Sequence, residues 1–437
     1  MAETDTVTDP SQAIMKNILH CFKIVAGFMG KRKAFTGPLW VQIGISNPCN
    51  HRCIMCWDHP SVVAENSPYP TEEHERYYKS YPEIDRDKGF MDLEMLRELI
   101  ADLRNLGTRR IELVGRGEPT LHPKFDQVIE ILKNYEFTVG MATNGSLLTP
   151  KRCEHLVRCG LDRIIVSLNA GTRNIYPSIH TTEKPESFDK IVENIKILDK
   201  IKHQMGKNIP LMALSFVISR INWNEGLKMI DRAGEAGANR IIFKYVTSYP
   251  NIEYLELTDE EKRDFSKQTT AFIRRAKRYG MDIKLEPPIG DETADIKLSH
   301  QKNKTIYSRI PCYIGWYFTL VTAEGSVIPC CQCMIKMGDL KHQRFTDIWY
   351  SDRYDDFREK MKRFPEHYNA LRNCACDQCE FEKINTTIYN KLHFYSPLHL
   401  HNAQSELSFF QLLRMIMQGQ EARGSKTFRR RLTSSRG

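Results

Sequence analysis

The sequence predicts an α/β protein, built as an open partial barrel of strand-and-helix units and followed by a small α+β domain. Two observations support this fold class. Between residues 39 and 249, short apolar strand patterns alternate strictly with amphipathic helix patterns, and such alternation indicates parallel, right-handed units. The pattern provides six strands, which are too few for a closed barrel of eight. We therefore expect an open sheet that binds its ligand at the carboxyl ends of the strands.

The elements follow in order along the chain. Strands are expected at Leu39–Ile45, Arg110–Val114, Thr138–Ala142, Arg163–Leu168, Leu211–Ile218 and Arg240–Val246. Helices are expected at Ala13–Phe28, Met91–Leu106, Phe125–Tyr135, Pro150–Cys159, Glu186–Met205 and Glu225–Ala236. Residues 58–89 form a long insert, either a lid or a slack surface loop. Residues 250–305 are charged and weakly patterned apart from a helix near Asp259–Tyr279, and we expect them to bridge two domains.

Composition and charge favour a globular protein without a nucleic-acid surface. The 437 residues include 41% hydrophobic and 27% charged residues, which is ordinary for two or three folded domains. Of the net charge of +9, the last fifteen residues supply +6 and residues 1–33 supply +2. The folded body is therefore nearly neutral, and specific nucleic-acid binding is not expected. The basic segment Arg423–Gly437 has the composition of a disordered tail.

The thirteen cysteines are expected to lie in a reducing, cytoplasmic compartment. The chain starts with acidic residues instead of the basic region of a secretory signal. No apolar run reaches the length of a transmembrane helix. The amphipathic segments Ile14–Met29 and Leu407–Met417 could each lie on a membrane surface, but docking on the protein's own core is the favoured interpretation. Cys21, Cys153 and Cys159 fall in helical patterns and are expected in the core.

Three cysteines, Cys49, Cys53 and Cys56, occur within eight residues directly after the first strand. A four-iron cluster that only carries electrons takes four thiolates. A loop that offers three would leave one iron free to bind a reactive molecule. The alternative is a zinc site, for which His51 or His59 would supply the fourth ligand.

The three cysteines and the strand-and-helix pattern together resemble the radical S-adenosylmethionine (SAM) superfamily, over about residues 39–245. The resemblance implies that Cys49, Cys53 and Cys56 hold a [4Fe–4S] cluster whose open iron chelates the amino and carboxylate groups of SAM. The residue before the third cysteine is usually aromatic in the family. Here it is Met55, with Trp57 next to the cysteine.

Further positions resemble the family's SAM contacts. Gly115, Gly117 and Glu118 lie in a segment similar to the glycine–glutamate motif that receives the ammonium group of SAM. Other positions at the ends of later strands resemble SAM contacts, although their residues also suit ordinary turns; they are Asn144, Ser167 and Asn169. Many relatives have an arginine for the carboxylate of SAM where this chain has His180, and Arg173 is a nearby substitute.

A second cysteine group resembles the auxiliary-cluster extensions called SPASM or twitch domains. The spacing of Cys312, Gly325 and Cys330 carries this resemblance, together with the final cysteines of the chain. It implies one auxiliary [4Fe–4S] cluster rather than two, because Cys379 is the last cysteine. The expected ligands are Cys312, Cys330, Cys376 and Cys379, with Cys374, Cys331 and Cys333 in reserve. A structural zinc site with four cysteines is the alternative.

These resemblances imply a domain plan. Residues 1–38 form an N-terminal extension, 39–249 the radical SAM core, 250–305 a bridging region, 306–390 the SPASM or twitch domain, and 391–437 a C-terminal helix with a basic tail.

The resemblance also implies an activity. An electron donor such as flavodoxin or ferredoxin would drive reductive cleavage of SAM, and the resulting 5′-deoxyadenosyl radical would abstract hydrogen from an unactivated C–H bond. Net oxidation or bond formation on a small, carbohydrate-like or other metabolite is preferred, because the segment before Leu39 is short for a separate peptide-recognition domain. Modification of a peptide or protein residue is one alternative, and a non-catalytic metal-binding protein is another.

Overall fold

A computed structural model describes most of the folded body of the chain. The described residues are 10–56, 88–246, 252–286, 309–331, 333, 335–364, 376, 379 and 381–394. Most of the 58–89 insert, the Leu407–Met417 segment and the basic tail lie outside them, as do Trp57, His59 and Cys374.

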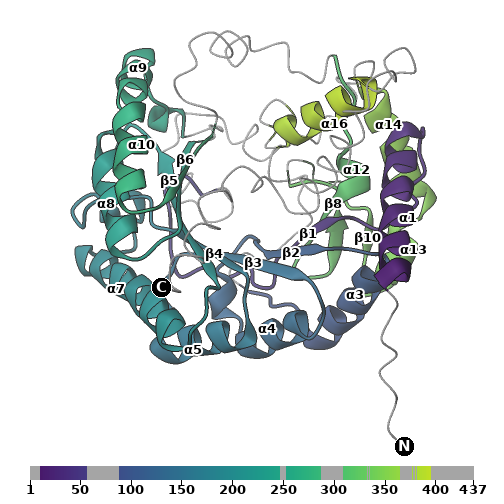
Figure 1. The fold of residues 1–437 in the computed structure, drawn as a ribbon, viewed down its shortest axis with the longest axis horizontal. Helices are drawn as coiled ribbons and strands as arrows, with labels where there is room; N and C mark the ends of the chain where they lie inside the picture. Colours follow the sequence, from purple (N-terminus) through teal and green to yellow (C-terminus); the bar gives the residue numbers. More distant parts are fainter. Residues whose placement is uncertain are drawn as a thin grey trace, which may run out of the picture.

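One ten-stranded sheet organises the structure, in the order β10-β9-β8-β1-β2-β3-β4-β5-β6-β7. The strands are β1 (Trp40–Ile43), β2 (Arg110–Leu113), β3 (Thr138–Thr143), β4 (Arg163–Ser167), β5 (Leu211–Ile218), β6 (Arg240–Tyr245), β7 (Asp282–Glu286), β8 (Phe318–Val321), β9 (Ser326–Ile328) and β10 (Gly338–Asp339). Strands β8 and β1 to β7 are parallel, whereas β9 and β10 are antiparallel additions. The sheet curls without closing (Figure 1).

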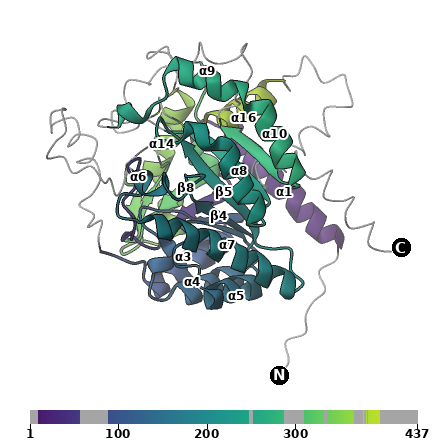
Figure 2. The ribbon, with the colours of Figure 1, turned by 90° about the vertical axis from the view of Figure 1, so that its left-hand side faces the viewer.

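Helices cover the outer side of this curved sheet (Figures 1 and 2). The described helices are α1 (Pro10–Met29), α3 (Leu93–Asn105), α4 (Phe125–Lys133), α5 (Pro150–Cys159), α6 (Tyr176–Ile179), α7 (Pro185–Gln204), α8 (Gly226–Glu235), α9 (Asp259–Lys267), α10 (Thr269–Arg278), α12 (Ile314–Tyr317), α13 (Phe345–Trp349), α14 (Asp352–Lys362) and α16 (Glu382–Phe394), of which α16 lies on the open side of the sheet (Figure 1). Short 3-10 turns occur at η2 (Pro119–Leu121), η3 (Trp223–Glu225) and η4 (Glu253–Leu255). Among the described residues, no helix is both long and apolar enough to cross a membrane.

The two faces of the sheet differ in polarity because side chains alternate along each strand. The residues that face the helices are apolar and fully buried, as in Ile111, Val139 and Ile164. On the opposite face, Glu112 lies in one cross-strand row with Gly140 and Arg163. A Cβ atom on Gly140 would overlap the carboxylate of Glu112, so this glycine makes room for a buried ion pair between Glu112 and Arg163, with an N···O distance of 3.0 Å.

The six predicted strands and their helices are present, with ends that differ by up to three residues, so the prediction of an open α/β barrel is confirmed. Two further parallel strands, β7 and β8, extend this barrel. β7 comes from the region expected to act only as a bridge, and pairs in parallel with β6. β8 pairs in parallel with β1, so the C-terminal region continues the same sheet. β7 escaped prediction because charged residues occupy three of its five positions.

Helix α1 packs on the C-terminal part of the protein. The rings of Phe28 and Tyr313 lie 5.6 Å apart, and Lys362 donates a hydrogen bond of 2.6 Å to the carbonyl of Phe28. Ile24 and Phe28 are buried. This packing agrees with the docking interpretation of the first amphipathic segment.

Candidate active site

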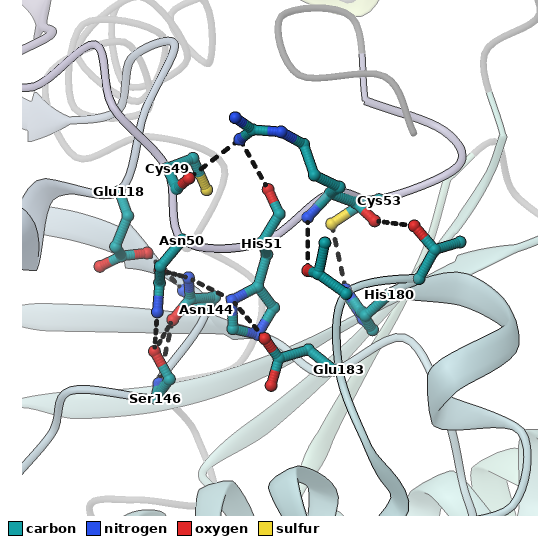
Figure 3. Close-up of polar contacts among 12 residues, drawn as sticks. Cys49, Asn50, His51, Cys53, Glu118, Asn144, Ser146, His180 and Glu183 are labelled. Atoms are coloured by element: carbon teal, nitrogen blue, oxygen red, sulfur yellow. Dashed lines mark hydrogen bonds and ion pairs between the residues drawn. The ribbon is translucent and has the colours of Figure 1, made fainter. Parts of the chain in front are cut away.

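Cys49, Cys53 and Cys56 lie in the loop that follows β1, at the carboxyl edge of the parallel sheet (Figure 3). A second segment is hydrogen-bonded to this loop. It consists of the end of α6 and the residues that follow it. Cys53 and His180 form an isolated antiparallel bridge. The amide of Ile54 donates to the carbonyl of Ile179 at 3.0 Å, and the amide of Thr181 donates to the carbonyl of Arg52 at 2.9 Å. The cysteine loop is therefore held on both sides of Cys53.

The ring of His180 contacts the sulfur atom of Cys53. Its Nδ1 atom lies 3.0 Å from the Sγ atom of Cys53, and its Nε2 atom lies 3.3 Å from the carbonyl oxygen of Leu168. Burial, and then the charge of His51, lowers the pKa of His180 to about 3. A neutral ring that donates from Nε2 to Leu168 keeps Nδ1 as an acceptor, so this contact requires the protonated Cys53 thiol; a hydrogen bond to the thiolate requires the ring proton on Nδ1 instead.

The electrostatics of the three thiols suit a cationic centre. Burial raises the pKa of Cys53 well above its ordinary value, and the neighbouring charges of Cys56 and Cys49 raise it further. Burial also raises the pKa of Cys49. Three thiolates in one small loop repel one another, and an iron centre relieves both the repulsion and the cost of burial. The donor set therefore fits the cluster that the sequence predicts.

The glycine–glutamate segment packs directly on the residues before Cys49. The amide of Gly117 donates to the carbonyl of Ser46 at 3.0 Å, and the amide of Glu118 donates to that of Pro48 at 2.9 Å. A Cβ atom on Gly117 would overlap the carbonyl oxygens of Asn47 and Pro48. This position needs glycine for close backbone approach, and the approach brings Glu118 to Cys49.

Glu118 is a buried carboxylate held by a set of donors. Its side chain accepts from the hydroxyl of Thr143 at 2.6 Å, from the amide of Asn144 at 2.8 Å, and from the amide and hydroxyl of Thr120. Burial raises the pKa of Glu118, and these hydrogen bonds oppose the rise. The charge of Glu118 in turn contributes to the raised pKa of Cys49. The carboxylate is thus fixed beside the first cysteine.

Asn144 links the end of β3 to the cysteine loop (Figure 3). Its side-chain amide donates to the Oδ1 atom of Asn50 at 2.8 Å and lies 3.1 Å from the Nδ1 atom of His51. Its own Oδ1 atom accepts from the hydroxyl of Ser146 at 2.7 Å. The Nε2 atom of His51 reaches the hydroxyl of Tyr176 at 3.1 Å. The side-chain amide of Asn50 donates to the hydroxyl of Ser146 at 2.9 Å. Sequence patterns did not single out Asn50, Ser146 or Tyr176, because their contacts with one another and with His51 and Asn144 mostly join loops far apart in the chain.

The other predicted SAM contacts lie around this centre with different partners. Ser167 is the last residue of β4 and pairs with Ser215 of β5. Asn169 has a positive φ of 56°, and its side-chain oxygen accepts from the amide of Val217 at 3.0 Å. Gly115 lies against Gly44, where a Cβ atom would come within 2.5 Å of the neighbouring Cα.

Arg173 is half exposed and forms ion pairs with Glu186 at 2.8 Å and Asp189 at 3.4 Å on α7. It therefore lies outside the hydrogen-bonded network that surrounds the cysteine loop. His180 is fully buried against Cys53 and the carbonyl of Leu168.

The expected auxiliary ligands also come together. Burial raises the pKa of Cys312, and the charges of Cys379 and Cys376 raise it further. The amide of Asn385 lies 3.8 Å from the Sγ atom of Cys312, and the backbone amide of Phe381 lies 3.3 Å from that of Cys379. Cys330 follows β9, which pairs with β8, so it returns toward α12. Of the reserve cysteines, Cys333 is disulfide-bonded in this structure.

Tyr317 lies close to several cysteines of this second group. Its side chain is buried, and the charges of Cys312, Cys379, Cys330 and Cys331 all add to the burial that raises its pKa. In the part of the chain that the structure describes, its hydroxyl has no hydrogen-bond partner. A buried hydroxyl without a partner is costly, and sulfur atoms of a bound cluster would be acceptors for it. The site therefore fits an iron–sulfur cluster, and Tyr317 is a residue that cysteine spacing alone did not reveal.

Family models match both regions. The radical SAM superfamily model matches residues 43–213, and the model of the SPASM iron–sulfur cluster-binding domain matches residues 312–380.

Similar proteins cover most of the chain. The tungsten-containing aldehyde ferredoxin oxidoreductase cofactor-modifying protein of Pyrococcus furiosus is 22% identical over 79% of this chain and 89% of its own length. The AdoMet-dependent heme synthase of Methanosarcina barkeri is 22% identical over 68% of this chain and 81% of its own. Among solved structures, SuiB of Streptococcus suis bound to S-adenosylmethionine has a TM-score of 0.57 at 14% identity, covering 92% of this chain and 84% of SuiB. SuiB bound to its precursor peptide SuiA has a TM-score of 0.55 at 13% identity, covering 92% and 83%.

The likeness to SuiB supports the fold, and the two family models account for the two cysteine groups. The radical SAM domain implies a [4Fe–4S] cluster and SAM, and the SPASM domain implies auxiliary iron–sulfur binding. The chain therefore belongs to the radical SAM superfamily of enzymes and has a C-terminal SPASM domain.

Proposed function

We propose that this enzyme reductively cleaves SAM at a cluster held by Cys49, Cys53 and Cys56, and that it oxidises or forms a bond at an unactivated C–H of its substrate. The observation that carries the proposal is the convergence of these thiols with the fixed carboxylate of Glu118 at one edge of the sheet. When bound, the cluster and SAM supply a 5′-deoxyadenosyl radical, which takes a hydrogen atom from the substrate. The residues of the chain bind SAM and the substrate, orient them for the reaction and exclude water from the site.

Glu118 receives the ammonium group of SAM in this proposal. Its carboxylate is oriented by the hydroxyl of Thr143 and the amide of Asn144, so little reorganisation is needed when a cation binds. Its proximity to Cys49 would hold the amino group of SAM at the cluster, where the nitrogen would lose one proton to chelate iron and its remaining N–H groups would donate to Glu118. Ser167 and Asn169 are the further proposed contacts of SAM at the end of β4. Gly115 and Gly117 contribute by letting their backbone pack closely on Gly44 and on residues 47–48.

We assign His180 to positioning Cys53, because both of its ring nitrogens already have partners in the buried site. Arg173 remains a candidate for the carboxylate of SAM, although its ion pairs with Glu186 and Asp189 would have to open first. Surface ion pairs of this kind are weak, so opening them costs little free energy.

A small metabolite is our first proposal for the substrate. The two curated relatives, by name, modify a cofactor and synthesise heme, and each matches more than two thirds of this chain. Modification of a peptide or protein residue is the second candidate, favoured by the SuiB structure with bound precursor peptide. A flavodoxin or ferredoxin is the proposed electron donor.

We further propose that Cys312, Cys330, Cys376 and Cys379 hold one auxiliary [4Fe–4S] cluster, which accepts the electron that remains on the substrate after hydrogen loss. Tyr317 donates its buried hydroxyl to a sulfur of this cluster. Hydrogen bonds to sulfur stabilise the reduced state of such clusters and raise their potentials. Asn385, from α16, lies at 3.8 Å from the sulfur of Cys312 and adds to the same environment.

The activity is tested by anaerobic reconstitution with iron and sulfide, followed by addition of SAM and dithionite. We expect 5′-deoxyadenosine and methionine from the wild-type chain and neither product from Cys49→Ala. Protein that carries an intact three-cysteine cluster but releases no 5′-deoxyadenosine would falsify the proposal. Activity assays with small metabolites and with peptides then separate the two substrate classes.

Glu118→Gln should weaken the binding of SAM about 10- to 100-fold, because a charged hydrogen bond to the ammonium contributes about 1.5–3 kcal/mol. Equilibrium binding to the reconstituted enzyme measures the effect. Glu225→Gln is the matched control, since Glu225 is also a buried carboxylate, accepting from Gly171 and Thr172 in another turn. Equal weakening by both substitutions would contradict a direct role for Glu118.

Replacing Cys376 and Cys379 together with alanine should lower the iron content of the reconstituted chain by about half, because one of two four-iron clusters is lost. Cleavage of SAM should persist in part, since the first cysteine loop is intact. Cys21→Ala, a change to a buried cysteine of α1, should leave the iron content unaltered. About four irons in the wild-type chain, instead of about eight, would rule out the auxiliary cluster.

Tyr317→Phe should lower the midpoint potential of the auxiliary cluster by about 20–60 mV, which corresponds to about 0.5–1.5 kcal/mol for one hydrogen bond. An EPR-monitored redox titration measures it on the signal that does not respond to SAM. Tyr313→Phe is the control, because that ring is equally buried and its hydroxyl also has no partner in the described chain, but it packs on Phe28. Unchanged potentials in both variants would contradict the contact.

A further inference from the structure

A second group of metal-ligating side chains lies on the outer helices, away from both cysteine groups. Helices α4 and α5 are neighbours on the outside of the sheet (Figures 1 and 2). Asp126 and Glu130 occur one turn apart on α4, and His155 and Cys159 occur one turn apart on α5. Residues four apart share one face of a helix, so each helix offers a pair of ligands to the other.

The ligand atoms of three of these residues are close enough to share one ion. Single ligand atoms of Glu130, His155 and Cys159 all lie within 4.8 Å of one another. The Sγ atom of Cys159 lies 3.4 Å from the Nε2 atom of His155, which in turn lies 3.8 Å from a carboxylate oxygen of Glu130. Two ligands of a tetrahedral zinc ion, with bonds of about 2.0–2.3 Å, are separated by roughly 3.3–3.6 Å. A small movement of the exposed Glu130 side chain would close the site.

Asp126 provides an additional acceptor beside the group. In the described part of the chain, its Oδ1 atom is buried and has no hydrogen-bond partner. The charges of Glu130 and Asp126 both raise the pKa of Cys159, after the effect of burial. A cation would satisfy the orphaned oxygen and relieve this accumulation of negative charge.

His155 has alternative partners without metal, because its Nε2 atom contacts the carbonyl of Asp126 at 3.1 Å and its Nδ1 atom contacts Arg158 at 3.2 Å. The Arg158 contact favours Nδ1 as an acceptor, which leaves Nε2 as the ring atom on the Cys159 side. Binding of an ion at Nε2 therefore replaces the hydrogen bond to the carbonyl and moves the ring proton to Nδ1, where the contact with Arg158 has to open. One proton is released, from the Cys159 thiol.

We propose that Glu130, His155 and Cys159 form a zinc site that joins α4 to α5, and that the side chain of Asp126, which lies outside this group in the structure, turns in as the fourth ligand. One thiolate, one imidazole and carboxylate oxygens are a donor set that zinc accepts in tetrahedral geometry. The site does not depend on the proposed reaction. It lies on helices that follow the segments of Glu118 and Asn144, so the ion stabilises the outer support of those segments.

The test is zinc binding to the full chain with its iron–sulfur clusters reconstituted. After dialysis against a weak chelator, we expect one zinc per chain, and a zinc-edge X-ray absorption spectrum with one sulfur and about three nitrogen or oxygen neighbours. Cys159→Ser and His155→Ala should each weaken zinc binding at least about tenfold. Iron content and 5′-deoxyadenosine formation report that these variants are folded.

Glu130→Gln should also weaken zinc binding, whereas Glu154→Gln should not, because Glu154 is an exposed acid of α5 that faces Arg158. Three or four sulfur neighbours would show zinc in a cysteine cluster site instead and would overturn the proposal. Retention of zinc by Cys159→Ser, or a wild-type chain that binds none, would overturn it as well. Loss of SAM cleavage with normal zinc binding would count against the proposed reaction alone.

Discussion

The close approach of two backbone segments is the constraint on which the active site depends. Residues 46–48 and 115–118 follow neighbouring strands, β1 and β2, and hydrogen-bond to each other through the amides of Gly117 and Glu118. No side chain fits between them at Gly117. This contact places a carboxylate beside the first of three thiols, although more than sixty residues separate them in the chain. A methyl group at Gly117 would push the cysteine loop away from Glu118.

Burial then determines the electrostatics of the site. Glu118, His51 and His180 are each less than 5% exposed, so their charges are weakly screened and their hydrogen bonds are strong. Burial lowers the pKa of His51 and of His180, which keeps both rings neutral next to the cysteine loop. The negative charges of the thiolates and Glu118 are therefore not compensated by histidine. The charge of Arg52 offsets part of this negative charge, because it lowers the pKa of Cys49 and of Cys53 against the effect of burial. An iron centre and a cationic cofactor would supply the rest.

The sequence predicted the barrel and the cysteine groups because both have local signals. The periodicity of a strand or helix can be recognised within one segment of sequence, and the spacing of Cys49, Cys53 and Cys56 is contained in one loop. β8 carried too little information, because a strand of four residues is recognised only when its partner β1 is known. Asn50, Tyr176 and Tyr317 were missed for a related reason. Their roles arise from contacts between distant loops, and neither periodicity nor cysteine spacing encodes such contacts. The ion pairing of Arg173 with Glu186 of α7 is a side-chain contact that the sequence does not reveal.

The pairing of β1 with β8 also separates the two cysteine groups. The strands are parallel, and Trp40 of β1 pairs with Phe318 of β8. Cys49 follows the carboxyl end of β1, whereas Tyr317 precedes the amino end of β8, and antiparallel β9 returns Cys330 to that same end. Each strand residue adds about 3.3 Å, so the two ends of this four-residue strand pair lie about 10 Å apart. The two cysteine groups follow opposite ends of the pair, which agrees with two separate centres. The ring of Trp40 lies 5.7 Å from that of Phe381, which lies 6.3 Å from Tyr317. Aromatic packing thus fills the interval between the sheet and the auxiliary site, and the rigid β1–β8 pair fixes the separation across which an electron would have to pass.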